Sequence, residues 1–197
     1  MAQSPPRSPP CSESLTETAP TLRALYESYF DLVWRFAANR GVPSSSLEDV
    51  VREVFEVVHR QLGGLAERPA TRTWVAGVTR NVVRNYLRQH SSWSSEELLS
   101  NNELYYAGDL GPAEALERKS PGELLDVILQ KMTDLQCEAF ILCEIEGLSA
   151  VEAAEALYVR EDTLRARLRD ARKVYNAISA RLRAQRFWVA REGGNEP

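Results

Sequence analysis

Apolar side chains recur every three or four residues through most of the chain, the spacing of one buried helical face. No convincing alternation of apolar and polar residues, as in a β-strand, interrupts this pattern. The helices that the spacing predicts cover residues 21–39, 47–62, 72–89, 122–131, 133–146, 149–157 and 161–178. The sequence therefore predicts an all-α protein.

Residues at the expected helix ends support these bounds. Gly41 and Gly147 follow helices as C-terminal stops, and Pro43 prevents the first helix from continuing. Three pairs have the spacing of a capping box, in which a hydroxyl and a side chain three residues later cap one helix: Ser45 with Glu48, Thr133 with Gln136 and Ser149 with Glu152.

Composition groups the helices into two small domains joined by a flexible linker. The start of the chain is rich in proline and serine, and periodicity weakens again where "SSWSS" and "GDLGP" occur. The expected division is a disordered N-terminal tail over 1–20, a helical domain over 21–90, a linker over 91–120, a second helical domain over 121–186 and a C-terminal tail over 187–197.

Charge is strongly segregated beneath a net charge of −4. Between Ser91 and Val159 there are 14 acidic and 3 basic residues, whereas between Arg160 and Arg191 there are 10 basic and 3 acidic ones. The asymmetry favours a polyanion-binding end, although a solvated charged helix has the same composition.

The basic end contains two helices separated by a very short break. If Leu164, Leu168 and Ile178 define the buried side of the last helix, the outward side chains are Arg165, Ala166, Arg169, Asp170 and Lys173, with Arg167 and Arg172 on the flanks. Two helices with a tight turn and an arginine-rich outer face predict a helix-turn-helix whose second helix reads a DNA major groove.

A second basic row is expected on the third helix. Arg80, Arg84 and Arg88 recur every four residues beside Asn81 and Asn85. Guanidinium groups contact phosphates and amides bond to base edges, so this row favours nucleic acid with exposed bases. An ordinary solvated helix face is the alternative.

Other function classes lack support in the sequence. No segment approaches the roughly 18 apolar residues of a membrane span, and no secretory signal opens the chain, so we expect a cytoplasmic protein without membrane insertion of its own. The three cysteines and two histidines are not spaced as metal ligands. No catalytic constellation or phosphate loop is present, so we expect neither an enzyme nor a cofactor.

Four segments resemble the two conserved regions of bacterial RNA polymerase sigma factors of the extracytoplasmic-function group. They are "YESYFDLVWRFA", "LEDVVREVFEVVHR", "RTWVAGVTRNVVRNYLRQ" and, after the linker, "MTDLQCEAFILCEIEGLSAVEAAEALYVREDTLRARLRDARK". The resemblance covers roughly residues 24–90 and 121–183. It implies an alternative sigma factor that binds core RNA polymerase, directs it to specific promoters and assists promoter melting.

The resemblance also implies partners and residue roles. The partners are promoter DNA, the clamp helices and flap of the polymerase, and an anti-sigma factor. The candidates for binding core polymerase are Asp49, Arg52, Glu53 and Phe55. The candidates for the −10 element are Arg72, Thr73, Trp74, Arg80, Asn81, Arg84, Asn85 and Arg88. The candidates for the −35 element are Thr163, Arg165, Ala166, Arg167, Arg169, Asp170, Arg172 and Lys173.

Several positions depart from the family pattern. Tyr158 stands where a glycine is usual in the helix-turn-helix break, so we expect a turn there that is either strained or differently built. Ala76-Gly77 replaces a bulkier and more basic pair, Arg160 replaces an N-cap serine, and Asp170 replaces a basic residue; Met132-Thr133 replaces leucine-proline.

Two other functions stay open on the sequence alone. A helix-turn-helix regulator would bind duplex DNA without polymerase and use only the last helices. A sigma-like adaptor would act through protein contacts alone, consistent with the departures at Tyr158 and Asp170.

Overall fold

The computed structural model describes residues 21–62, 71–90 and 119–192, with the side chains of the last helix described to residue 183. All regular structure within these ranges is helical, which confirms the all-α prediction. The expected N-terminal tail, nearly all of the expected linker and the loop over 63–70 lie outside the described residues.

Three helices form the N-terminal module. They are α1 (Leu22–Asn39), α2 (Leu47–Leu62) and α3 (Arg72–His90), and each packs against the other two. Valines make up much of the buried core between these helices. The most deeply buried of these valines are Val33, Val50, Val54, Val58, Val75 and Val83.

The start of α2 differs from the expected capping box. A single 3₁₀ turn, Ser44–Ser46, leads directly into the helix, with the Ser46 amide 2.9 Å from the Pro43 carbonyl oxygen. The backbone of the turn therefore takes the place expected for a cap between Ser45 and Glu48. Gly41 ends α1 with φ of 86°, as predicted.

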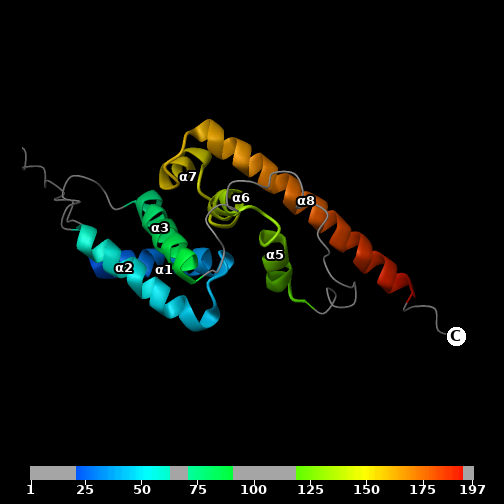
Figure 1. Cartoon of the computed structure of the whole chain (residues 1–197), viewed down its shortest axis with the longest axis horizontal. Helices are drawn as coiled ribbons and strands as arrows, with labels where there is room; N and C mark the ends of the chain where they lie inside the picture. The colour runs from blue at the N-terminus through cyan, green and yellow to red at the C-terminus, as the bar shows by residue number, and fades with distance from the viewer. Residues whose placement is uncertain (1–20, 63–70, 91–118, 193–197) are drawn as a thin grey trace, which may run out of the picture.

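The C-terminal module is arranged around one long helix (Figure 1). Its elements are α5 (Pro121–Leu129), α6 (Asp134–Phe140), a π-helical turn (Ile141–Ile145), α7 (Ala150–Ala156) and α8 (Glu161–Glu192). Helices α5, α6 and α7 all pack on α8, which extends toward the C-terminus. The expected domain end at residue 186 falls inside this helix.

Capping explains where the short helices begin. Thr133 and Gln136 form the predicted capping box of α6, and Ser149 and Glu152 form that of α7. A third box, between Ser120 and Glu123, begins α5 and is absent from the sequence prediction. The starts of α5, α6 and α7 are thus set by local side-chain bonds.

The two modules pack against each other. Helix α7 lies beside α3, and the π-helical turn contacts α1, so the buried residues form one continuous core (Figure 1). Helical periodicity predicts the modules but gives no information on this contact, because the residues that meet are far apart in the chain.

Candidate nucleic-acid interface

Helices α7 and α8 form the predicted helix-turn-helix. Tyr158 occupies the turn with φ of 53°, the left-handed conformation that the position requires. A tyrosine there is strained, because a Cβ atom disfavours positive φ. The residue as a whole is 73% exposed, so it gains little burial in return.

The outward face of α8 comprises Arg165, Ala166, Arg169, Asp170 and Lys173, and we call it the α8 face. The burial pattern confirms the predicted inner side, since Leu164, Leu168 and Ile178 are buried. Arg165, Arg169 and Lys173 are exposed, whereas Ala166 and Asp170 are half-buried. Three basic side chains therefore reach solvent from one side of the helix.

Acidic neighbours engage most of these cations. Arg165 bonds to Glu161 one turn earlier, and the Lys173 Nζ lies 2.9 Å from Asp170 Oδ1. Among the described residues Arg169 forms no ion pair, so its guanidinium is the one most available to a base or phosphate. The bond to Lys173 also occupies the Asp170 carboxylate.

The other −35 candidates lie around this face. Thr163 is exposed at the start of α8. Arg172 is turned toward α6 and its π-helical extension, with its Nη2 2.6 Å from Glu144 Oε1. Arg167 is half-buried, and its Nη1 is buried without a hydrogen-bond partner. Of the two predicted flanking arginines, Arg167 is thus partly withdrawn from solvent, whereas Arg172 stays exposed but is paired with Glu144.

The predicted basic row on α3 is divided. We call Arg80, Asn81, Arg84, Asn85 and Arg88 the α3 face. Four of these are exposed, but Arg80 is directed into the contact between the modules, where its Nε lies 3.1 Å from Glu138 Oε2. Arg84 and Arg88 alone supply freely exposed cations there.

The residues in the first turn of α3 are also wholly or partly buried. Arg72 donates a hydrogen bond to the backbone carbonyl of Glu146, Thr73 is 7% exposed and Trp74 is half-buried. The eight −10 candidates therefore do not form one open surface in this arrangement.

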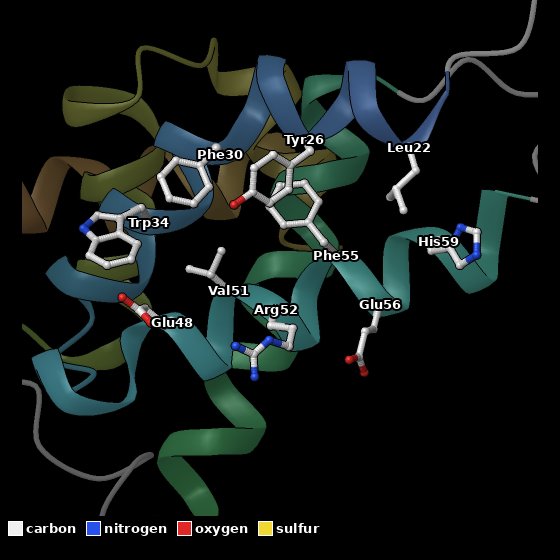
Figure 2. Close-up of a pocket in the computed structure, with 10 residues that line it drawn as sticks. All are labelled: Leu22, Tyr26, Phe30, Trp34, Glu48, Val51, Arg52, Phe55, Glu56 and His59. Atoms are coloured by element: carbon white, nitrogen blue, oxygen red, sulfur yellow. The ribbon is translucent and has the colours of Figure 1, made fainter.

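A groove lies between α1 and α2 (Figure 2). Its volume is about 480 Å³. The residues lining this aromatic groove are Leu22, Tyr26, Phe30, Trp34, Glu48, Val51, Arg52, Phe55, Glu56 and His59. The aromatic rings follow one another closely, with centroids 5.2 Å apart for Tyr26 and Phe30 and 4.6 Å for Tyr26 and Phe55.

The groove brings together two of the four predicted polymerase-binding residues. Arg52 lines it and is exposed, while Phe55 forms part of its floor at 6% exposure. Asp49 and Glu53 are exposed on α2 outside the lining, and Asp49 pairs with Arg52 at 3.2 Å. Tyr26 lines the same groove and is 45% exposed, with its ring tilted against that of Phe55.

Comparison with protein families decides what this pair of modules is. A model of sigma-70 region 2 matches residues 25–92, and a model of sigma-70 region 4 matches residues 122–174. The two matches together span more than half of the chain and follow the family order. The chain belongs to the sigma-70 family.

Relatives of this sigma-70 chain lie in the extracytoplasmic-function group. The chain is 26% identical over 155 residues to the ECF RNA polymerase sigma factor SigE of Mycolicibacterium smegmatis, covering 78% of this chain but only 60% of SigE. It is 24% identical over 160 residues to the ECF sigma factor SigM of Bacillus subtilis, covering 80% and 94% of the two chains.

Solved structures share the fold. CnrH, in complex with the cytosolic domain of CnrY, matches with a TM-score of 0.59 at 21% identity, over 83% of this chain and 88% of CnrH. The sigma factor RpoE of Bartonella quintana, in complex with the anti-sigma factor NepR, matches with a TM-score of 0.61 at 17% identity, over 80% and 96%.

Region 2 and region 4 of this sigma-70 chain contact each other through residues that sequence reasoning missed. Arg35 and Arg40 of region 2 pair with Glu146 and Asp134 of region 4. Hydrogen bonding to Glu146 raises the pKa of Arg35 above its ordinary value. The strongly acidic run between Ser91 and Val159 was the one available signal, but acidic residues are ordinarily exposed.

Neither a metal site nor a membrane span adds to these surfaces. In the described ranges no three metal-ligating side chains cluster, and no helix there is long and apolar enough to cross a membrane. Burial raises the pKa of Cys137, so its thiol is poorly suited to act as a nucleophile.

Proposed function

We propose that the chain is an alternative sigma factor that binds core RNA polymerase, directs it to specific promoters and assists DNA melting. The observation that carries this proposal is the presence of two separate basic helical faces on the two sigma-70 regions, in family order. One chain can then contact a promoter at two places, whereas a protein with only a helix-turn-helix would contact it at one.

The α8 face is suited to duplex DNA. It stands on the second helix of a helix-turn-helix, and such a helix enters the major groove with its first turns. We propose that Arg169 and Arg165 pair with guanine and that Lys173 holds a phosphate, after Arg165 and Lys173 exchange their present partners Glu161 and Asp170 for DNA. We therefore assign this face to the −35 element.

The α3 face is suited to an opened strand. Arginines alternating with asparagines offer both phosphate contacts and hydrogen bonds to base edges. Extruding a base costs a few kcal/mol, which stacking and hydrogen bonds in a pocket can offset. Two half-buried aromatic residues stand close to this face in the sequence, Tyr86 beside Asn85 and Trp74 at the start of α3. We assign the α3 face and its first turn to the −10 element.

The aromatic groove is suited to a helical protein partner. An apolar floor with charged side chains at its edge is the usual composition of a protein–protein contact. We propose that Arg52, Phe55 and the neighbouring acids of α2 bind the clamp helices of core polymerase. The polymerase, not this chain, then carries out nucleotide addition.

An anti-sigma factor is the second proposed partner. Both structural relatives described above were solved with a bound protein, and NepR is named as an anti-sigma factor.

Run-off transcription with purified core polymerase and a promoter library tests the function. The wild-type chain should give core-dependent, promoter-selective transcripts. A double variant, Arg165→Ala with Arg169→Ala, should lose selectivity, whereas Arg181→Ala, which removes an exposed cation farther along α8, should retain it.

The same experiment separates the alternatives. Binding of duplex DNA without any association with core would establish a helix-turn-helix regulator instead. Association with core but no promoter-selective transcript, with no duplex binding, would establish a sigma-like adaptor.

A further inference from the structure

One buried carboxylate ties the two regions together. The Glu146 side chain is 0% exposed and accepts two hydrogen bonds from Arg35, each with a donor–acceptor distance of 2.9 Å. Arg72 bonds to the Glu146 backbone and lies 3.7 Å from its carboxylate. Glu146 of region 4 therefore holds both α1 and the first turn of α3.

A second buried carboxylate holds the middle of α3. The side chains of Glu138 and Arg80 are 3% and 11% exposed and lie 3.1 Å apart. An unpaired charge in such a place is very costly, so Glu138 stays buried only while Arg80 faces it. Arg80 cannot reach a phosphate without leaving this partner.

A third pair closes the edge of the contact. Arg40 at the end of α1 lies 2.8 Å from Asp134 at the start of α6, and its side chain is 7% exposed. Burial by itself lowers the pKa of Arg40, but Cys137, Asp134 and Glu138 around it raise the pKa above its ordinary value. Every acid in these three pairs belongs to region 4, and every base to region 2.

Close approach of α7 to α3 depends on a glycine. A Cβ built on Gly77 would lie 3.2 Å from the Ala156 carbonyl oxygen and 3.7 Å from the Tyr158 hydroxyl. Gly77 and Tyr158 are two positions at which the sequence departs from the family pattern. Both departures therefore fall on the same contact, where a bulky and basic pair on α3 would not fit.

We propose that this chain holds itself in a closed state in which Glu138 and Glu146 of region 4 occupy Arg80 and Arg72 in place of nucleic-acid phosphates. The masking of a DNA surface rests on the proposed function, whereas the closure itself does not. The contact includes the ion pairs of Arg72 and Arg80 beside its apolar residues, so a polyanion competes directly for these two guanidinium groups. Its apparent affinity is reduced by the fraction of molecules that are closed.

Neutral variants of the full-length chain test the closure. Glu138→Gln with Glu146→Gln removes both charges from region 4 while nearly conserving side-chain volume. Glu155→Gln is the matched control, because Glu155 is exposed on α7 and in no ion pair among the described residues. Gly77→Leu opens the contact by a different route, since it places a side chain against the Ala156 carbonyl.

Two measurements report the outcome. Small-angle X-ray scattering gives the radius of gyration, and fluorescence anisotropy gives the affinity for a short labelled single strand of random sequence. Both opened variants should have a larger radius of gyration than the wild type and bind the strand at least about threefold more tightly. The Glu155→Gln control should match the wild type in both, and circular dichroism should show unchanged helix content.

A charge exchange tests the specific pair. Arg80→Glu alone should expand the chain, and Arg80→Glu combined with Glu138→Arg should restore its compactness. If Glu138→Gln with Glu146→Gln loses helix content, Gly77→Leu and the charge exchange still test whether the chain is closed.

Two results would overturn the proposal. The first is a wild-type chain whose radius of gyration already equals that of Gly77→Leu. The second is that the opened variants bind the labelled single strand with no higher affinity than Glu155→Gln does. Neither measurement uses polymerase. Closure without core-dependent transcription would therefore refute the proposed function and leave the closed state standing.

Discussion

Single residues carry much of what distinguishes this chain. Tyr158 adopts a conformation that suits glycine, and Arg169 is the basic residue of the α8 face that forms no ion pair within the described ranges, whereas Arg165 and Lys173 have acidic partners. Sequence comparison with the family pattern located the first of these. Whether Arg169 forms an ion pair depends on which residues its neighbours one turn away contact. The spacing of residues in the sequence does not specify those contacts. Each makes a prediction that one substitution can check.

Tyr158→Gly should stabilise the protein. A left-handed backbone costs an L-residue roughly 1–2 kcal/mol, and the added flexibility of glycine in the unfolded chain offsets part of the gain. We expect the free energy of unfolding to rise by about 0.5–1 kcal/mol in a denaturant titration. Val151→Gly, at another exposed position, should instead lower it by about 1 kcal/mol because glycine disfavours helix interiors. Equal destabilisation by both would show that Tyr158 is not strained.

Arg169→Ala should affect promoter choice more than Arg165→Ala. Loss of a base contact costs about 1–3 kcal/mol and relaxes selectivity at one base pair. Arg165 must first leave Glu161 to bind DNA, so its net contribution should be smaller. Affinity measured across single-base variants of a selected promoter checks this. Uniform weakening across all sequences would identify Arg169 as a phosphate contact.

At the scale of elements, sequence predicts this molecule well. Most helix starts, the inner side of α8 and two capping boxes follow from the spacing of apolar residues and hydroxyls, because these features are set within one or two turns. The end of α8 does not, since the helix continues to Glu192, beyond the expected end at residue 178. The capping box expected between Ser45 and Glu48 was wrong for a reason that is also local. The backbone there forms a 3₁₀ turn, which the spacing of the side chains does not reveal.

Ser149→Ala should destabilise α7 through loss of its capping box. The Ser149 hydroxyl accepts from the Glu152 amide, and the Glu152 carboxylate accepts from the Ser149 amide and hydroxyl. We expect a loss of about 1 kcal/mol in the free energy of unfolding. Ser149→Thr retains a hydroxyl and should lose much less. A fully stable Ser149→Ala variant would contradict a role for the cap.

The same box gives a pH dependence. Hydrogen bonds from Ser149 lower the pKa of Glu152, so the folded chain binds this proton less readily than the unfolded chain. The contribution is therefore present above the ordinary glutamate range and lost as pH falls through the lowered pKa. Thermal melts should show the difference between wild type and Ser149→Ala shrinking in acid. A constant difference would exclude the carboxylate.

At the scale of the whole molecule, sequence predicts the parts but not their contact. Glu138 and Glu146 look like ordinary surface acids, because nothing within a few turns reveals that Arg80 and Arg35 will bury them. Those partners lie 58 and 111 residues away in the chain. Burial of charge is decided by tertiary packing, which helical periodicity does not encode.

Salt dependence links the contact to nucleic-acid binding. Each phosphate neutralised on a single strand contributes about −0.7 to the slope of log affinity against log salt. In the closed chain, Arg84 and Arg88 are the free arginines of the α3 face, and Arg80 becomes available only after opening. Glu138→Gln should therefore steepen the slope by about 0.7, and Arg84→Ala should make it shallower by about 0.7. Arg60→Ala removes an exposed cation of α2 and should leave the slope unchanged.

Anisotropy titrations over a range of salt concentrations measure the wild type and these three variants. An unchanged slope in Glu138→Gln would mean that Arg80 binds no phosphate even when Glu138 no longer holds it.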